Sequence, residues 1–152
     1  MRDLRPNLRP WLWASTALCG LGIVVSGYLA SKRLTGGSLA CTRWAQCDVV
    51  NNSVYAKIVG IPVSFIGLAA YLVLLALAIA ALRTDGRVQR QMILISLLFS
   101  IGGMGFSVYL TYLEVYVIEA LCAWCVASAI IITLLAIVGA VLMLRSAPRG
   151  AA

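Results

Sequence analysis

Four long stretches of the sequence contain no charged residue, and each is long enough to cross a lipid bilayer. They cover residues 11–31, 61–82, 91–113 and 120–144, and a transmembrane helix needs about 20 apolar residues. The composition agrees, since 62% of the residues are hydrophobic and 11% are charged, against roughly 45–50% and about 25% in soluble domains. The pattern predicts an all-α integral membrane protein, in which residues 1–152 form a single membrane domain built as a four-transmembrane-helix bundle.

Most of the basic residues lie on one side of these predicted helices. Eight of the 12 Lys and Arg residues precede the first stretch, separate the second from the third, or follow the fourth. Only Lys32, Arg33, Arg43 and Lys57 lie on the other side. Because basic residues concentrate in cytoplasmic segments, we expect a multi-pass protein of the cell (inner or cytoplasmic) membrane with both termini in the cytoplasm. Residues 32–60 then form a long extracytoplasmic loop between the first two helices.

The polar residues exclude several other functions. The net charge of +7 is explained by residues that flank apolar stretches, so a nucleic acid is not an expected partner. The absence of histidine removes the commonest general base and the best nitrogen ligand for zinc. Glu114 and Glu119 bound a short outer link before the last helix. We interpret both as solvated, with a proton path through Glu114 as the lesser alternative.

Two pairs of cysteines fall on the outer side of this topology. Cys41 and Cys47 lie in the long loop, and Cys122 and Cys125 lie at the outer start of the last helix. Residues three apart share a helix face, and a helix N-terminus favours a thiolate. Two dithiols on the side where disulfides persist can exchange electrons by attack of a thiolate on a disulfide.

Each pair also has a simpler interpretation when taken alone. The loop pair is compatible with a structural staple, and the Cys-x-x-Cys pair with a coincidence of small buried residues. A four-cysteine zinc site fits less well, because the spacer between Cys41 and Cys47 is longer than usual, and no metal is expected. Cys19 lies in mid-helix and is interpreted as a small hydrophobe. A staple does not need a second dithiol at the same depth, so the two pairs together favour a relay.

Three motifs, in this order, resemble the vitamin K epoxide reductase family, particularly its bacterial members. The loop contains Cys41-x5-Cys47-x5-Ser53, the second helix opens with Gly60-Ile-Pro-x-Ser64-x-x-Gly67, and the last opens with Cys122-x-x-Cys125. The resemblance extends over nearly the whole chain. It implies a quinone-dependent thiol oxidoreductase that generates disulfides in extracytoplasmic proteins, with menaquinone or ubiquinone as the electron acceptor.

The resemblance also implies a role for each site residue. Cys41 would exchange with a thioredoxin-like (DsbA-type) protein, which we expect to be a separate chain. Cys47 would pass electrons to Cys122, and Cys125 would be the thiolate that meets the quinone. Ser53 matches a hydroxyl residue expected near the quinone-site cysteine, although a turn or cap residue after two asparagines is the alternative.

The quinone needs an apolar cleft between helices with a few polar groups. The candidates on the outer side, beside Cys125, are Tyr28, Ser64, Phe65, Tyr109, Tyr112 and Tyr116. The last three recur at three- and four-residue spacing, which is also typical of an interfacial aromatic belt. Phe106 is interpreted as packing or lipid-facing.

Two positions depart from the pattern of the animal enzymes of this family. Ala129 and Val63 stand where the animal enzymes have a tyrosine and an asparagine, which argues against epoxide reduction.

Two other functions are alternatives. The first is a DsbB-type oxidase, but in those proteins the Cys-x-x-Cys comes in the first outer loop, so the order here is reversed. The other alternative is a non-enzymatic four-span membrane protein or transporter with structural disulfides. Transporters usually place an ionisable residue inside a span, and none of the four stretches has one.

Overall fold

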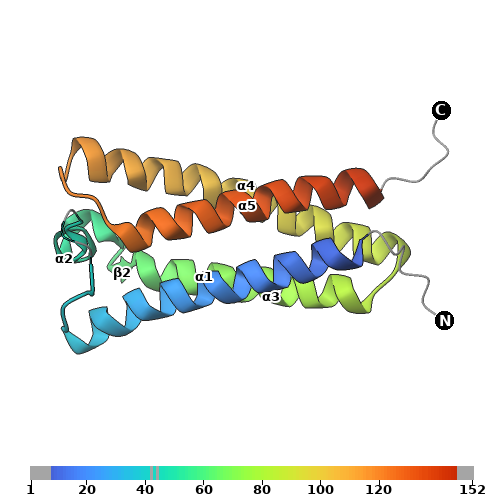
Figure 1. Cartoon of the computed structure of the whole chain (residues 1–152), viewed down its shortest axis with the longest axis horizontal. Helices are drawn as coiled ribbons and strands as arrows, with labels where there is room; N and C mark the ends of the chain where they lie inside the picture. The colour runs from blue at the N-terminus through green and yellow to red at the C-terminus, as the bar shows by residue number, and fades with distance from the viewer. Residues whose placement is uncertain (1–7, 42, 44, 147–152) are drawn as a thin grey trace.

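The computed structural model describes residues 8–41, 43 and 45–146, and most of them are helical (Figure 1). The four long helices are α1 (Arg9–Thr35), α3 (Val63–Arg83), α4 (Gly86–Tyr116) and α5 (Ala123–Ser146). Each is long and apolar enough to cross a membrane. The predicted all-α bundle of four membrane helices is therefore confirmed. Arg2, Arg5 and Arg149, which contribute to the predicted orientation, lie outside the described residues.

The short elements all lie between α1 and α3. They are α2 (Cys47–Asn52), a 3-10 turn η1 (Val54–Ala56), and the two-residue strands β1 (Lys57–Ile58) and β2 (Ile61–Pro62). The strands pair antiparallel, with Lys57 opposite Pro62 and Ile58 opposite Ile61. These elements and the link from α4 to α5 lie at the same end of the bundle (Figure 1), which is called the loop end below.

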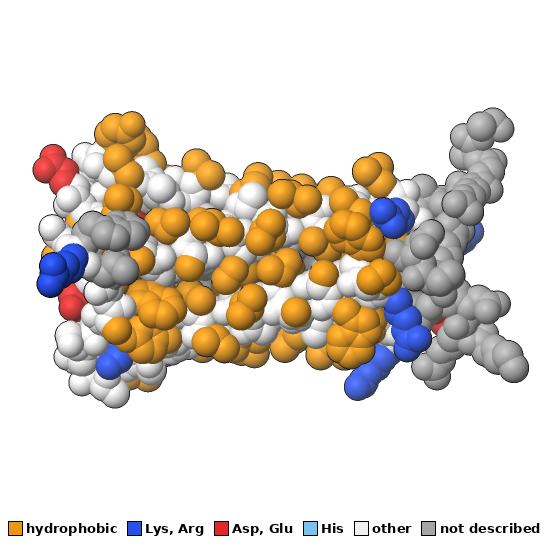
Figure 2. Space-filling model, in the orientation of Figure 1, with side chains coloured by type: hydrophobic (Ala, Val, Ile, Leu, Met, Phe, Trp, Pro, Cys, Tyr) orange, Lys and Arg blue, Asp and Glu red, His pale blue; other side chains and the backbone are white. Residues whose placement is uncertain are grey.

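The helices form a closed ring in which each packs on two antiparallel neighbours. α1 packs against α3 and α5, and α4 packs against the same two helices. Figure 2 shows hydrophobic side chains along the length of the visible face, with Lys and Arg side chains at its two ends. Such an apolar belt between basic ends suits a bundle that is surrounded by lipid.

The helix ends differ from the predicted spans by a few residues, in both directions. α4 begins five residues before the predicted residue 91 and ends three residues after residue 113, since Arg87, Arg90 and Glu114 are compatible with helix at or beyond the membrane surface. α1 runs to Thr35 and stops at Gly36, whose φ of 64° gives the left-handed end that glycine favours. α5 begins at Ala123, so the predicted start at residue 120 is three residues too early.

A buried tyrosine fills the space between the helices in the middle of the bundle. Tyr71 of α3 is 3% exposed and belongs to a buried cluster with Cys19, Leu74 and Ile132. Its hydroxyl donates a hydrogen bond of 2.9 Å to the backbone oxygen of Ser128 in α5. The ring of Tyr71 lies directly against Gly22 of α1, where an added Cβ atom would overlap it. α1 and α3 therefore approach this closely only because residue 22 is glycine.

We predict that Gly22→Ala destabilises the bundle and that Gly20→Ala does not. Overpacking a filled site costs about 1–3 kcal/mol, whereas alanine in an open helix interior gains roughly 0.5–1 kcal/mol over glycine. A Cβ atom at residue 20 meets no atom within 4 Å, so the second variant is a matched control. Thermal unfolding in detergent measures the difference. Equal midpoints for the two variants would contradict the assigned contact.

Candidate functional site

The loop end holds a disulfide between Cys41 and Cys47. The two Cα atoms are 6.2 Å apart, and Cys47 is the first residue of α2. Asp48 follows in the first turn, and its carboxylate oxygen Oδ1 accepts the N–H of Leu39 at 2.8 Å. This bond holds the segment before Cys41 against α2.

The residue before Cys41 is bound on both sides of its backbone. The hydroxyl of Tyr28 in α1 accepts the N–H of Ala40 at 3.0 Å, and Nε1 of Trp124 in α5 donates to the oxygen of Ala40 at 2.9 Å. The two aromatic rings are in contact, with centroids 4.8 Å apart. The loop disulfide is therefore anchored to α1 and α5 together.

A backbone hydrogen bond brings the two cysteine pairs together. The N–H of Gln46 donates to the oxygen of Leu121 at 2.9 Å, and each of these residues directly precedes a cysteine. The two cysteines, Cys47 and Cys122, are 1% and 0% exposed and belong to the same buried cluster. Cys41 and Cys125 pack against this cluster. All four sulfur-bearing residues thus meet at the loop end.

Cys122 and Cys125 are not joined by a disulfide, and a backbone N–H group within the pair binds one of its sulfur atoms. Cys122 lies just before α5, and its Sγ accepts the N–H of Cys125 at 3.3 Å. Hydrogen bonding from Cys125 lowers the pKa of the Cys122 thiol below its ordinary value, although burial opposes the effect. The N–H of Cys122 donates in turn to Oε2 of Glu114 at 3.1 Å. The environment of Cys122 therefore favours the thiolate, which is the reactive form of a cysteine.

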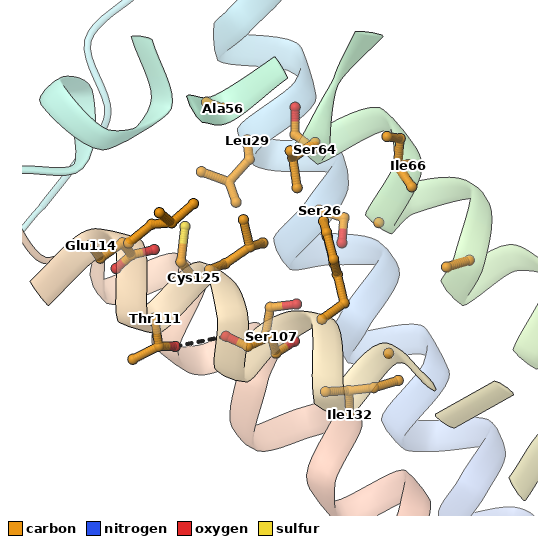
Figure 3. Close-up of a pocket in the computed structure, with 18 of the residues that line it drawn as sticks. Ser26, Leu29, Ala56, Ser64, Ile66, Ser107, Thr111, Glu114, Cys125 and Ile132 are labelled. Carbon is orange, nitrogen blue, oxygen red and sulfur yellow. Dashed lines mark hydrogen bonds between the residues drawn. The ribbon is translucent and has the colours of Figure 1, made fainter. Parts of the chain in front are cut away.

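Cys125 lies on the wall of a large cavity between the helices. The cavity has a volume of about 660 Å³ and is lined by residues of α1, α3, α4, α5 and the loop. Figure 3 shows the sulfur of Cys125 and the carboxyl group of Glu114 close together, at the end of the cavity near the loop. Its walls are mostly apolar, with a few hydroxyl groups such as those of Ser26 and Ser64. A cavity of this size and character suits a ring-shaped organic molecule.

Only some of the residues predicted to contact a quinone line this cavity. Ser53, Ser64 and Cys125 do. The Ser64 hydroxyl is buried and has no hydrogen-bond partner within the described part of the chain. The Ser53 hydroxyl donates to the oxygen of Val50 at 2.8 Å, so this residue also closes the end of α2.

The other predicted residues lie elsewhere. Tyr28, Phe65, Tyr109, Tyr112 and Tyr116 are not among the residues that line the cavity. Tyr28 instead binds the loop, as described above. Tyr109 and Tyr112 are each 56% exposed on α4, which fits the alternative of an interfacial aromatic belt. Their spacing identified a common helix face, but this face points away from the cavity.

Three residues near the cysteines lie where the sequence did not predict them. Glu114 was expected to be solvated, but it is 3% exposed and lines the cavity. Its position only eight residues before Cys122 could have indicated that it lies near the cysteine pair. Phe106, expected to pack or to face lipid, also lines the cavity. Trp124 stands between the two cysteines of the last helix, and only the fold shows that it binds the distant residue Ala40.

Two further observations concern metals and the fifth cysteine. Within residues 8–41, 43 and 45–146, no three side chains of His, Cys, Asp or Glu are grouped as metal ligands. Cys19 is free and buried in the middle of the bundle, packed with apolar residues. Its surroundings fit the predicted small hydrophobe.

Residues 13–140 match the model of the vitamin K epoxide reductase family. The matched region covers most of the chain and contains all four paired cysteines.

We predict that Tyr28→Phe loosens the loop without removing the contact between the aromatic rings. The variant loses one hydrogen bond, worth about 1 kcal/mol, so amide exchange in residues 36–46 should become roughly fivefold faster. Hydrogen exchange measured by mass spectrometry reads this segment directly. Tyr116→Phe is the control, because Tyr116 is exposed and its hydroxyl makes no hydrogen bond to any described residue. Unchanged exchange in Tyr28→Phe would refute the anchoring role.

Proposed function

The chain belongs to the vitamin K epoxide reductase family, and from this premise we propose that it oxidises the thiols of a thioredoxin-like partner and reduces a quinone. Membership supports a quinone-linked thiol oxidoreductase in the membrane. The proposed relay runs from Cys41 and Cys47 to Cys122 and Cys125, and then to the quinone. The observation that carries it is the pairing of Gln46 with Leu121, which sets Cys47 beside Cys122.

The two pairs have different surroundings, which supports a division of roles. Cys41 is half-buried at the loop end and forms a disulfide with Cys47. Cys125 faces the cavity, and the buried Cys47 and Cys122 lie between these two outer members of the relay. A protein partner therefore meets Cys41, and a small lipid-soluble molecule meets Cys125.

The proposed cycle consists of four thiol–disulfide exchanges in which electrons balance. A thiolate of the partner attacks Cys41 and breaks its bond to Cys47, and the partner's second thiolate then completes a disulfide within the partner. The freed Cys47 attacks Cys122 in a Cys122–Cys125 disulfide, which releases Cys125 as a thiolate. Cys41 then attacks Cys47, restores the loop disulfide and releases Cys122. The lowered pKa of Cys122 favours this last step, because thiols of lower pKa leave faster.

The cavity supports a quinone as the final acceptor. Oxidation of Cys122 and Cys125 to a disulfide releases two electrons, which pass to the quinone together with two protons. The cavity offers apolar walls to a quinone ring, and the unpartnered hydroxyl of Ser64 offers a hydrogen-bond donor to a carbonyl oxygen. These features fit ubiquinone and menaquinone alike.

We further propose that the loop end faces the extracytoplasmic side of the cell membrane. Eight of the 12 basic residues lie on the opposite side of the helices, as expected for the cytoplasmic side. The loop disulfide supports the same orientation, because disulfides persist outside the cytoplasm. The products would be disulfide-bonded extracytoplasmic proteins.

The first test replaces Cys125 by alanine in the purified protein. Quinone-dependent oxidation of a reduced thioredoxin-like protein should fall to the uncatalysed background, because no thiol then faces the cavity. The loop disulfide should still be reduced by the same partner, as read by alkylation of Cys41 and Cys47. Cys19→Ala serves as the control and should retain full activity. Undiminished activity in Cys125→Ala would overturn the proposed relay.

The second test replaces Ser64 by alanine. Loss of one hydrogen bond of about 1 kcal/mol should raise the KM for the quinone roughly fivefold, with little change in the exchange between cysteine pairs. Ser100→Ala is a matched control, because the Ser100 hydroxyl is also buried and unpartnered among the described residues but does not line the cavity. Equal KM values in both variants would remove Ser64 from the quinone site.

A further inference from the structure

Glu114 lines two cavities at the loop end. A second, smaller cavity of about 280 Å³ is bounded by Gln46, Val115, Glu119, Ala120 and Leu121, together with Glu114. The large cavity that contains Cys125 has Glu114 on its wall as well. Among the described residues, no other side chain is common to the two sets. The carboxyl group therefore separates a small cavity at the protein surface from the proposed quinone site.

The fold holds this carboxyl group in a fixed position. Glu114 lies in the last turns of α4 and is 3% exposed. Its Oε2 accepts the N–H of Cys122, and its backbone oxygen accepts the N–H of Ala120 at 3.0 Å. Because Oε2 already accepts the hydrogen bond from Cys122, the protonated form of Glu114 carries its proton on the other carboxyl oxygen, Oε1. A buried carboxyl group is costly in a membrane protein, and such groups commonly serve proton transfer.

The proposed reaction needs a proton path at this place. When the partner becomes a disulfide, its two thiol protons are released at the protein surface. When the thiolates of Cys122 and Cys125 become a disulfide, two electrons pass to the quinone, and its oxygens must take up two protons that the thiolates do not carry. Histidine, the usual proton carrier, is absent from the sequence. The proton must therefore cross from the surface to the cavity through another group.

We propose that Glu114 delivers protons from the small surface cavity to the quinone site, and this inference rests on the function proposed above. Glu114 gives its proton toward the large cavity as Cys125 gives up its electrons, and takes a new proton from water in the small cavity. Figure 3 places the carboxyl group next to the reacting sulfur, so electrons and protons enter the cavity at the same point. The ionisable side chains near it are those of Cys122 and Cys125 at the start of α5, and of Glu119 on the outer link.

The test uses Glu114→Gln in the full-length protein. Glutamine keeps the size of the side chain and can still accept the N–H of Cys122, but it cannot donate a carboxyl proton. The protein is first reduced and then mixed with a short-chain ubiquinone or menaquinone, and quinone absorbance follows a single turnover. Quinone reduction should slow by about 10²-fold or more, as expected for loss of a general acid. Glu114→Asp should recover a large part of the rate.

A second measurement separates proton delivery from a structural role. With both cysteine pairs oxidised and no quinone present, dithiothreitol reduces the Cys41–Cys47 disulfide and then the Cys122–Cys125 disulfide, and alkylation at set times gives the rate. This exchange should stay within about twofold of the original rate in Glu114→Gln, since proton transfer to quinone plays no part in it. Asp85→Asn serves as the carboxyl control and should leave both rates unchanged, because Asp85 is exposed before the first residue of α4, at the opposite end of the bundle.

Three results would overturn the inference, and they are distinguishable. If Glu114→Gln reduces the quinone as fast as the unaltered protein, Glu114 carries no proton. If the variant slows exchange and quinone reduction equally, or if Glu114→Asp recovers nothing, the carboxyl group only supports the fold around Cys122. If the unaltered protein itself reduces neither quinone, the proposed function fails, and the inference fails with it.

Discussion

The hydrogen bond from the N–H of Gln46 to the oxygen of Leu121 is the contact on which the arrangement of the site depends. The segment from residue 36 to residue 60 and the link before α5 are far apart in the sequence, and neither is part of a long helix. Buried backbone groups must be paired, so this bond fixes where the two segments meet. Because each partner directly precedes a cysteine, the bond also sets Cys47 beside Cys122. Apolar packing from Leu29, Leu39 and Ala120 then excludes water around both cysteines.

The described part of the bundle has few buried polar groups. Some of them hold helices together, and others face the cavity. Tyr71 and Ser128 satisfy one another and hold α3 to α5. Ser64 and Glu114 instead face the cavity beside Cys125. Burying such groups costs free energy unless they find hydrogen-bond partners. In the proposed function, a bound ligand or a transferred proton provides the missing partner. The apolar walls of the same cavity surround the Cys125 side chain.

Much of the architecture followed from local features of the sequence. Four uncharged stretches predicted the four helices, and the motifs around the cysteines indicated the family. The helix ends were less accurate, because charged residues such as Arg87 and Glu114 are compatible with a helix that extends beyond the apolar stretch. The assignment of tyrosines on α4 to the quinone site has no support from the cavity, since a shared face does not reveal which way that face points. Glu114 was misplaced because its position next to a short link suggested solvent.

The sequence by itself determined that the chain forms four apolar helices and that two cysteine pairs lie at the same end of them. Hydrophobic length and chain direction are enough for both conclusions. Only the tertiary structure decided that Cys47 meets Cys122, that Cys125 and Glu114 share a cavity, and that Tyr109 and Tyr112 do not. The reason is physical: helices that are apolar on all sides have no polar face to fix their rotation. Their rotation is set by close packing, such as that of Tyr71 on Gly22, between residues that are distant in the chain.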